Sequence, residues 1–257
     1  EKSLKEYRFN DYASILYQFT WHEFCDWYIE VVKPSITSEE NDSKSKDVLV
    51  LVLSHILRLL HPIMPFITEE IWEKLPIKEK ENSIMISDWP SFNPEFEDSV
   101  SEEEFSIIID IVSTIRNLRG ELNISPGKDI PCIMKLSSEE HKSLILREEE
   151  TIKRLARISS NWSIGSDVEY PKLTSSAVIR NIQIFIPLEG LIDVESEIGR
   201  LKKQIFETEK TISSLKKKLS NKEFVKKAPE EVIKKNKEKL KDELNRYEKL
   251  STNLKKL

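Results

Sequence analysis

Apolar residues recur at helical spacing through the first half of the chain. Between Lys5 and Val32 they fall three and four positions apart, which predicts a long helix. We expect Pro34 to end this helix, because the residue before a proline avoids the helical backbone. A second helix is predicted from Asp47 to Leu60, after the polar segment 35–46. It is apolar nearly all round, so we expect it to be buried between neighbours.

The stretch HPIMPF, residues 61–66, interrupts this pattern with two prolines. Pro62 ends the second helix, and Pro65 starts the next short one, because proline is tolerated in a first helical turn. Thr68 is the expected N-cap of that helix. We interpret the stretch as a rigid corner between two helices, in which His61 is structural rather than catalytic.

A fourth helix is predicted from the next run of apolar residues. Its start matches a capping box, with Ser101 followed three positions later by Glu104. Its apolar stripe comprises Phe105, Ile108, Val112, Ile115 and Leu122.

One position on the inward line of this helix is charged, namely Arg119. A buried arginine needs a partner, since an unpaired buried charge is very costly. Two interpretations stay open. Arg119 forms an internal ion pair, for example with Asp26 or Glu30, or it reaches an anionic ligand together with Arg116.

Residues 129–190 change to short β-like runs. These are IPCIMKL at 130–136, SAVIR at 176–180 and IQIFIPL at 182–188, with helical stretches at about 138–155. Asn181 lies where a hairpin would turn. We therefore predict a small α/β subdomain.

From Leu191 the apolar positions alternate steps of four and three, which is a heptad seam. A second such segment follows residues 220–231, with Pro229 at its start, where proline is tolerated. This pattern predicts an antiparallel coiled-coil hairpin about 40 Å long. The first seam comprises Val194, Ile198, Leu201, Ile205, Thr208, Ile212, Leu215 and Leu219; the second comprises Ile233, Leu240, Leu244, Tyr247, Leu254 and Leu257, with Asn236 as a polar break.

Together these patterns predict a mainly α protein in three parts. They are a helical bundle at 1–128, the small α/β subdomain at 129–190 and the coiled-coil arm at 191–257. The composition agrees, because 33% of residues are charged and only 5 are Gly.

The composition also limits the setting of the protein. No run of 18 apolar residues exists, so no membrane span is expected. Cys25 and Cys132 are too few for a disulfide framework or a zinc site, which favours a reducing cytoplasm. The chain begins with Glu1 and no signal pattern, so we expect it to be a piece of something longer.

The net charge of −5 hides an uneven distribution. Residues 191–257 carry 19 Lys and Arg against 12 Asp and Glu, whereas residues 1–190 carry 21 against 33. Lysines gather where the predicted hairpin turns, and such a cluster binds RNA phosphates independently of sequence. The alternative is an ordinary solvated face of a coiled coil. The cluster comprises Lys216, Lys217, Lys218, Lys222, Lys226 and Lys227.

Catalytic residues are not apparent. The four histidines show no metal spacing, and no glycine-rich phosphate loop occurs. We therefore expect a binding function, with no catalytic or metal-ligating residues in this sequence.

Several stretches together resemble one family. LHPIMPFITEEIWEKLP and FTWHEFCDWYIEVVKP are similar to the anticodon-binding bundle of class I aminoacyl-tRNA synthetases of the valyl, isoleucyl and leucyl group. IRNLRGELNISPGKDIP resembles the valyl version of the fourth helix and its following turn. PLEGLIDVESEIGRLKKQI and LSNKEFVKKAPEEVIKKNKEKL are similar to the valyl C-terminal coiled coil.

The resemblance implies the tRNA-binding C-terminal part of an enzyme that joins valine to its tRNA using ATP. The two ATP-site signatures of the family are absent, so ATP and Mg²⁺ would belong to a catalytic domain outside this sequence, and no cofactor is expected here. The implied partners are a valine tRNA and that catalytic domain, and we expect a monomer.

The resemblance also implies which residues contact RNA. The bundle would receive the anticodon loop, and the arm would follow the tRNA backbone toward its outer corner. The bundle residues are Arg116, Asn117, Arg119 and Lys128; the arm residues are Arg200, Lys202, Lys203, Lys216, Lys217, Lys218, Lys222, Lys226 and Lys227.

Two alternatives remain at this stage. The hairpin could be a structural module that pairs with a partner protein, which would require an exposed apolar stripe outside its seam. Phe206 and Phe224 are the conspicuous apolar residues there. The bundle could also come from an isoleucyl or leucyl relative, but those relatives lack this terminal hairpin.

Overall fold

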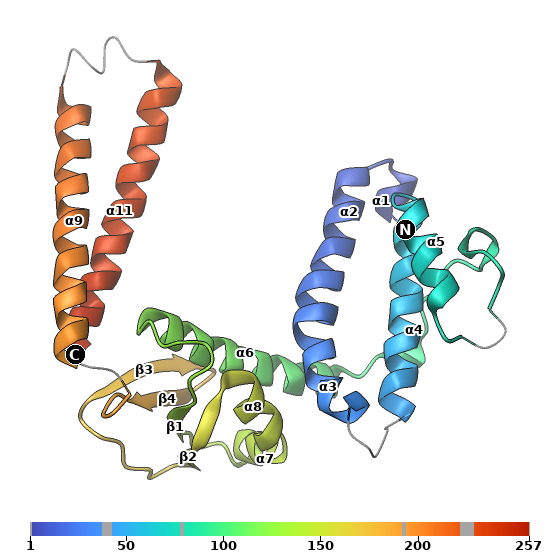
Figure 1. Ribbon diagram of the computed structural model, residues 1–257, viewed down its shortest axis with the longest axis horizontal. Helices are drawn as coiled ribbons and strands as arrows, with labels where there is room; N and C mark the ends of the chain where they lie inside the picture. Colours follow the sequence, from blue (N-terminus) through green and yellow to red (C-terminus); the bar gives the residue numbers. More distant parts are fainter. Residues whose placement is uncertain (1, 38–42, 78–79, 192–193, 222–228, 257) are drawn as a thin grey trace. The chain divides into compact units, whose positions relative to one another are not determined.

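A computed structural model describes residues 2–37, 43–77, 80–191, 194–221 and 229–256 (Figure 1). The chain divides into two compact units, residues 1–105 and 106–257. The structure is mainly helical with one small mixed sheet, as predicted. The predicted part boundaries at 128 and 190 stay predictions.

Unit 1 is built from helices. They are α1 (Lys2–Lys5), α2 (Phe9–Tyr17), the π-helix η1 (Gln18–Ile29), α3 (Glu30–Thr37), α4 (Ser43–Leu60) and α5 (Pro65–Lys74), followed by the short 3-10 helices η2 (Ile84–Ile86) and η3 (Pro94–Phe96). Helix α4 packs against α2, α3 and α5. Leu57, Trp72, Leu75 and Ile84 form a buried core at the α4–α5 contact, so the packing joins elements on both sides of the proline corner.

Of two expectations about the first two helices, one was wrong and one holds only in part. Pro34 lies inside α3, which continues to Thr37, so it does not end the helix. The missing N–H costs one hydrogen bond, and the described helix continues for three residues beyond Pro34. Helix α4 is also less buried than its composition predicts, because Val48 and Leu51 are 44% and 42% exposed.

The proline corner was predicted correctly, but its cap was not. Helix α4 ends at Leu60, two residues before Pro62, and α5 begins at Pro65. Thr68 therefore lies inside the first turn and is not the N-cap. Its hydroxyl donates to the Met64 carbonyl at 2.8 Å and lies 2.7 Å from His61 Nδ1. This pair holds the corner, which gives His61 a structural contact.

Helix α6 (Ser99–Glu121) begins with a different cap from the one predicted. The Asp98 carboxylate accepts the backbone N–H groups of Val100 and Ser101 at 3.1 Å each, and the Ser101 hydroxyl at 2.6 Å. These hydrogen bonds from Ser101 lower the pKa of Asp98. Ser101 is therefore a residue of the first turn, because the helix starts three residues earlier than the capping box implied. The stripe at Ile108, Val112 and Ile115 is buried as expected.

Unit 2 contains a four-stranded sheet in the order β2–β1–β4–β3. Its strands are β1 (Ile130–Lys135), β2 (Ile158–Gly165), β3 (Thr174–Ile179) and β4 (Ile182–Pro187). Strands β1 and β2 are parallel and are joined through α7 (Glu139–Arg147) and α8 (Glu149–Ala156), whereas β4 is antiparallel to both β1 and β3. The predicted helical stretches at about 138–155 correspond to α7 and α8. Strand β2 was not predicted, because its polar residues hide the β pattern.

The predicted hairpin at Asn181 is confirmed. Arg180 and Asn181 have φ values of 46° and 64°, so both occupy the left-handed region that a tight two-residue hairpin requires. Arg180 also reaches back to α6, where its Nε donates to Asp110 at 2.6 Å and its Nη2 donates to Ser106 Oγ at 2.8 Å. The turn is therefore anchored to α6.

Two long helices follow the sheet, α9 (Val194–Ser220) and α11 (Glu230–Lys256), and they pack against each other (Figure 1). Leu201, Thr208, Ile212 and Leu215 are buried along the predicted α9 seam. That the pair supercoils as a coiled-coil hairpin stays a prediction.

Leu244, which we assigned to the α11 seam, is 40% exposed, and the half-buried residue is Glu243. The steps through 233, 236, 240, 243 and 247 alternate three and four. Placing Leu244 in the seam would instead need two consecutive steps of four, which rotates the stripe away from the partner helix.

Candidate nucleic-acid interface

Arg119 lies in the last turn of α6 and is only 5% exposed. Its guanidinium donates to backbone carbonyls in two other segments of unit 2, so the predicted ion pair with Asp26 or Glu30 is wrong. Burial lowers the pKa of Arg119, and the charge of Asp129 partly opposes this shift. The acceptors are the carbonyls of Ser125 (2.8 Å), Arg157 (3.0 Å), Ala156 (3.2 Å), Pro126 (3.3 Å) and Lys128.

These contacts give Arg119 a structural role. A guanidinium has five N–H donors, and here those on Nη1 and Nη2 point into the turn after α6 and the end of α8. Contact between this guanidinium and RNA would break the hydrogen bonds that hold the turn. Direct contact between Arg119 and tRNA therefore stays a prediction, and these hydrogen bonds argue against it.

Arg116 and Asn117 lie on the outer face of the same turn, and both are exposed. Arg116 Nε and Nη2 donate to the Leu155 carbonyl at 3.2 Å and 3.0 Å, which directs its side chain to the end of α8. The two halves of the RNLR motif, residues 116–119, thus lie on different faces of the helix. Arg116 and Asn117 present polar groups to solvent, whereas Leu118 and Arg119 face the interior.

Lys128 is exposed and lies in the turn that Arg119 holds. Its Nζ donates to the Leu191 carbonyl at 2.6 Å. This bond connects the turn after α6 to the segment that leads into α9. Lys128 therefore places its charge near the base of the arm.

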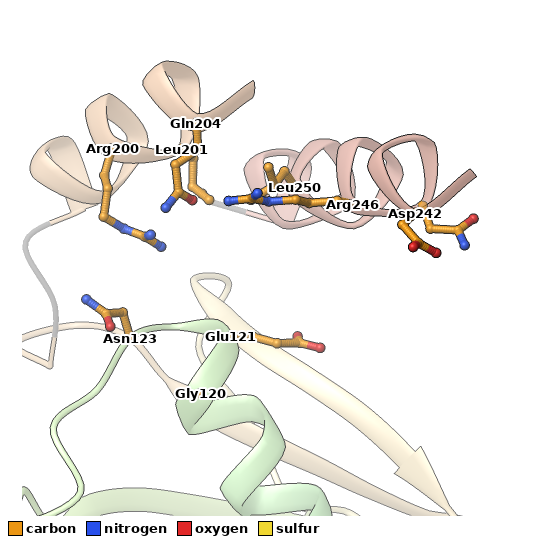
Figure 2. Close-up of a pocket in the computed structure, with 10 residues that line it drawn as sticks. Gly120, Glu121, Asn123, Arg200, Leu201, Gln204, Asp242, Arg246 and Leu250 are labelled. Carbon is orange, nitrogen blue, oxygen red and sulfur yellow. The ribbon is translucent and has the colours of Figure 1, made fainter. Parts of the chain in front are cut away.

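A cavity of about 550 Å³ lies between the end of α6 and the base of the arm. Figure 2 shows Arg200 of α9 and Asn123 of the turn extending toward each other, with Arg246 of α11 beside them. Asn123 ends α6 with a φ of 52°, in the left-handed conformation that Asn tolerates. The cavity is lined by Gly120, Glu121, Asn123, Arg200, Leu201, Gln204, Asp242, Asn245, Arg246 and Leu250.

The lining combines two guanidinium groups with three side-chain amides. Arginine forks match phosphate oxygens, and amides donate to the same acceptors. Glu121 and Asp242 restrict where an anion can approach, since like charges repel. The cavity is therefore suited to one phosphate group at the arginine side rather than to a run of them.

The described arm lysines lie on its outer surface. Lys202, Lys203, Lys216, Lys217 and Lys218 are all exposed, and none forms an ion pair with another residue that the structure describes. Lys222, Lys226 and Lys227 lie outside the described residues.

Four of the guanidinium and amide residues that line the cavity were not predicted from the sequence, namely Asn123, Gln204, Asn245 and Arg246. Nothing in the spacing of α11 distinguishes Arg246 from the other basic residues of that helix. Whether Arg246 reaches the cavity depends on which part of α11 lies at the base of the arm. This depends on the length of the segment that joins α9 to α11. A signal existed only for Asn123, since Asn after a helix end favours a left-handed cap.

Two further findings concern other kinds of site. Among the described residues, no group of three or more His, Cys, Asp or Glu side chains is arranged to hold a metal ion. None of the described helices is both long and apolar enough to cross a membrane.

Comparison with known families matches the chain in two places. Residues 1–134 match the anticodon-binding domain of tRNA ligase, and residues 193–257 match the valyl tRNA synthetase tRNA binding arm. The two matches follow each other in the order that the sequence resemblance implied.

Curated relatives match over most or all of the chain. Proteins named valine–tRNA ligase from Syntrophotalea carbinolica and Geobacter sulfurreducens are 42% and 40% identical over 100% of this chain. One from Bacillus subtilis is 37% identical over 92% of it. The chain spans only 29%, 29% and 27% of the lengths of these relatives.

Proposed function

Because the chain belongs to the anticodon-binding family of tRNA ligases, we propose that it is the tRNA-binding C-terminal region of a valine–tRNA ligase. The observation that carries this proposal is the succession of an anticodon-binding region and a valyl-type arm within one chain. The isoleucyl and leucyl alternative is disfavoured by the match of residues 193–257 to the valyl arm.

In this proposal the outer face of the α6 end binds the anticodon loop. Arg116 and Asn117 are exposed there, and contacts to base edges would select the tRNA. Lys128 supplies a nearby positive charge. Arg119 acts indirectly by fixing the turn on which these groups sit.

The arm binds the tRNA backbone. Its α9 and α11 form an antiparallel coiled-coil hairpin, and exposed lysines along α9 meet phosphates without reading sequence. Arg200 and Arg246 take one phosphate at the base of the arm. In the sequence, Lys222, Lys226 and Lys227 add three more cations that can bind phosphate without reading sequence.

Catalysis belongs to the whole ligase, of which this chain is the RNA-binding part. The complete enzyme would attach valine to its tRNA using ATP and Mg²⁺, in the cytoplasm and as a monomer. The residues described here position the tRNA for that reaction.

The test is a binding titration of the chain at several salt concentrations. One transcript is a valine tRNA, and the other is the same tRNA with its anticodon changed. We expect tighter binding to the intact anticodon and a steep salt dependence for both. Equal affinities would remove the anticodon-reading role and leave only the arm. Failure to bind either transcript would contradict the proposal.

A further inference from the structure

One flank of the arm carries exposed apolar side chains beside lysines. Phe206 of α9 is 64% exposed and Leu244 of α11 is 40% exposed. A cavity of about 550 Å³ opens between the two helices next to Leu244. It is lined by Glu209, Ile212, Ser213, Lys216, Lys217, Ser220, Leu244 and Tyr247.

Helical spacing places these α9 residues on one side of the helix. Positions 206, 209, 213, 216 and 220 are separated by three or four residues, so they form a single stripe. This stripe lies beside the seam rather than in it, because the seam uses positions such as 208, 212 and 215. We call this surface the arm flank and define it by Phe206, Lys216, Lys217, Leu244 and Tyr247.

The arm flank combines two chemistries. Ile212, which is 7% exposed, and the half-buried Tyr247 give the cavity an apolar floor, while Lys216 and Lys217 stand at its edge without an ion-pair partner among the described residues. Unstacked bases bind to aromatic and apolar faces, and neighbouring lysines bind the phosphates of the RNA backbone next to those bases.

The charges on the arm flank determine at which end the phosphate backbone of the tRNA would lie. Glu209 lines the same cavity two helical turns before Lys216, and its carboxylate repels phosphate. The phosphate would therefore pass at the lysine end, and the base would lie over Leu244 and Tyr247 toward Phe206.

We infer that the arm flank binds an unstacked nucleobase of the tRNA, with Lys216 and Lys217 holding the adjoining phosphates. This inference rests on the proposed function and adds a base contact to an arm otherwise expected to meet backbone alone. A partner protein helix fits less well, because the exposed apolar residues of the flank are few and are bordered by unpaired cations.

The test is the double variant Phe206→Ala and Leu244→Ala, titrated with a valine tRNA across a range of salt. Loss of a base contact weakens binding about fivefold or more, since stacking on one side chain is worth at least that much. The slope of log affinity against log salt stays unchanged, because no phosphate contact is removed. The matched control is Val232→Ala, since Val232 is 41% exposed on α11 but lies on the other flank of the seam.

Three outcomes would overturn the inference. The double variant could bind as tightly as the unchanged chain, or Val232→Ala could weaken binding equally. The double variant could also leave tRNA binding intact while abolishing self-association in sedimentation, which would assign the flank to a second copy of the chain. In each case strong salt-dependent binding by the unchanged chain would leave the proposed function standing. Absence of any binding by the unchanged chain would remove both.

Discussion

Arg119 shows how a single residue can look like a ligand-binding group and serve the fold. It is a cation on the inward line of a helix, and the sequence offers no acid at a fixed spacing to explain it. The structure satisfies its charge with carbonyl dipoles of Ser125, Ala156 and Arg157 among others. Such carbonyls belong to every residue, so no sequence pattern could have identified these acceptors.

Replacing Arg119 by Met should therefore affect stability first. The carbonyls would lose their donor inside a buried site, which costs about 1–3 kcal/mol for each acceptor left unsatisfied. We expect a loss of about 3 kcal/mol or more in the free energy of unfolding, measured with urea. Asn117→Ala is the control, because Asn117 is exposed on the same turn and should leave the unfolding curve unchanged. A stable Arg119→Met variant with weakened tRNA selectivity would instead support a direct contact between Arg119 and RNA.

At the scale of elements, the hairpin between β3 and β4 connects local backbone geometry to packing. Arg180 and Asn181 both adopt positive φ, and Arg180 also pairs with Asp110 on α6. The turn thus sets the strand register and ties the sheet to the helix whose outer face is the candidate RNA surface. A substitution that affects only the backbone of this turn would separate the effect of the turn geometry from the effect of the Arg180–Asp110 ion pair.

Asn181→Val provides that change, because Asn181 is exposed and a β-branched residue disfavours the left-handed region. We expect it to lower the free energy of unfolding by about 1–2 kcal/mol. Asn181→Gly should lie within a few tenths of a kcal/mol of the original chain, or be slightly more stable. Equal unfolding curves for the Val and Gly variants would contradict the left-handed conformation at this position.

The exposed lysines of α9 are tested at the same scale. The triple variant Lys216→Ala, Lys217→Ala and Lys218→Ala removes three cations without touching the seam. If all three meet phosphates, the slope of log affinity against log salt should fall by about two. Binding should weaken equally for intact and altered anticodons, because phosphate contacts carry no sequence information. An unchanged slope would exclude these lysines from the RNA surface.

For the whole molecule, the sequence predicted what periodicity and turn chemistry determine. The helices, three of the four strands, the hairpin turn and the proline corner follow from local patterns. Strand β2 was missed because ISSNWSIG pairs through its backbone with β1 and lacks apolar alternation. The cavity at the base of the arm needs Arg200 and Arg246 together. These residues are 46 positions apart in the sequence, and only the fold brings them together, so no local pattern predicts the cavity.

The two RNA surfaces proposed for this chain should act on different parts of one tRNA. Asn117→Ala should reduce the preference for the intact anticodon, whereas the triple lysine variant should lower affinity for both transcripts alike. Because the two surfaces share no side chains, their free-energy losses in a combined variant should add to within about 0.5 kcal/mol. The measurement is a double-mutant cycle of dissociation constants at one salt concentration. A combined loss no larger than that of the lysine variant alone would mean that the bundle contact forms only after the arm has bound, so that the arm orders the complex rather than merely strengthening it.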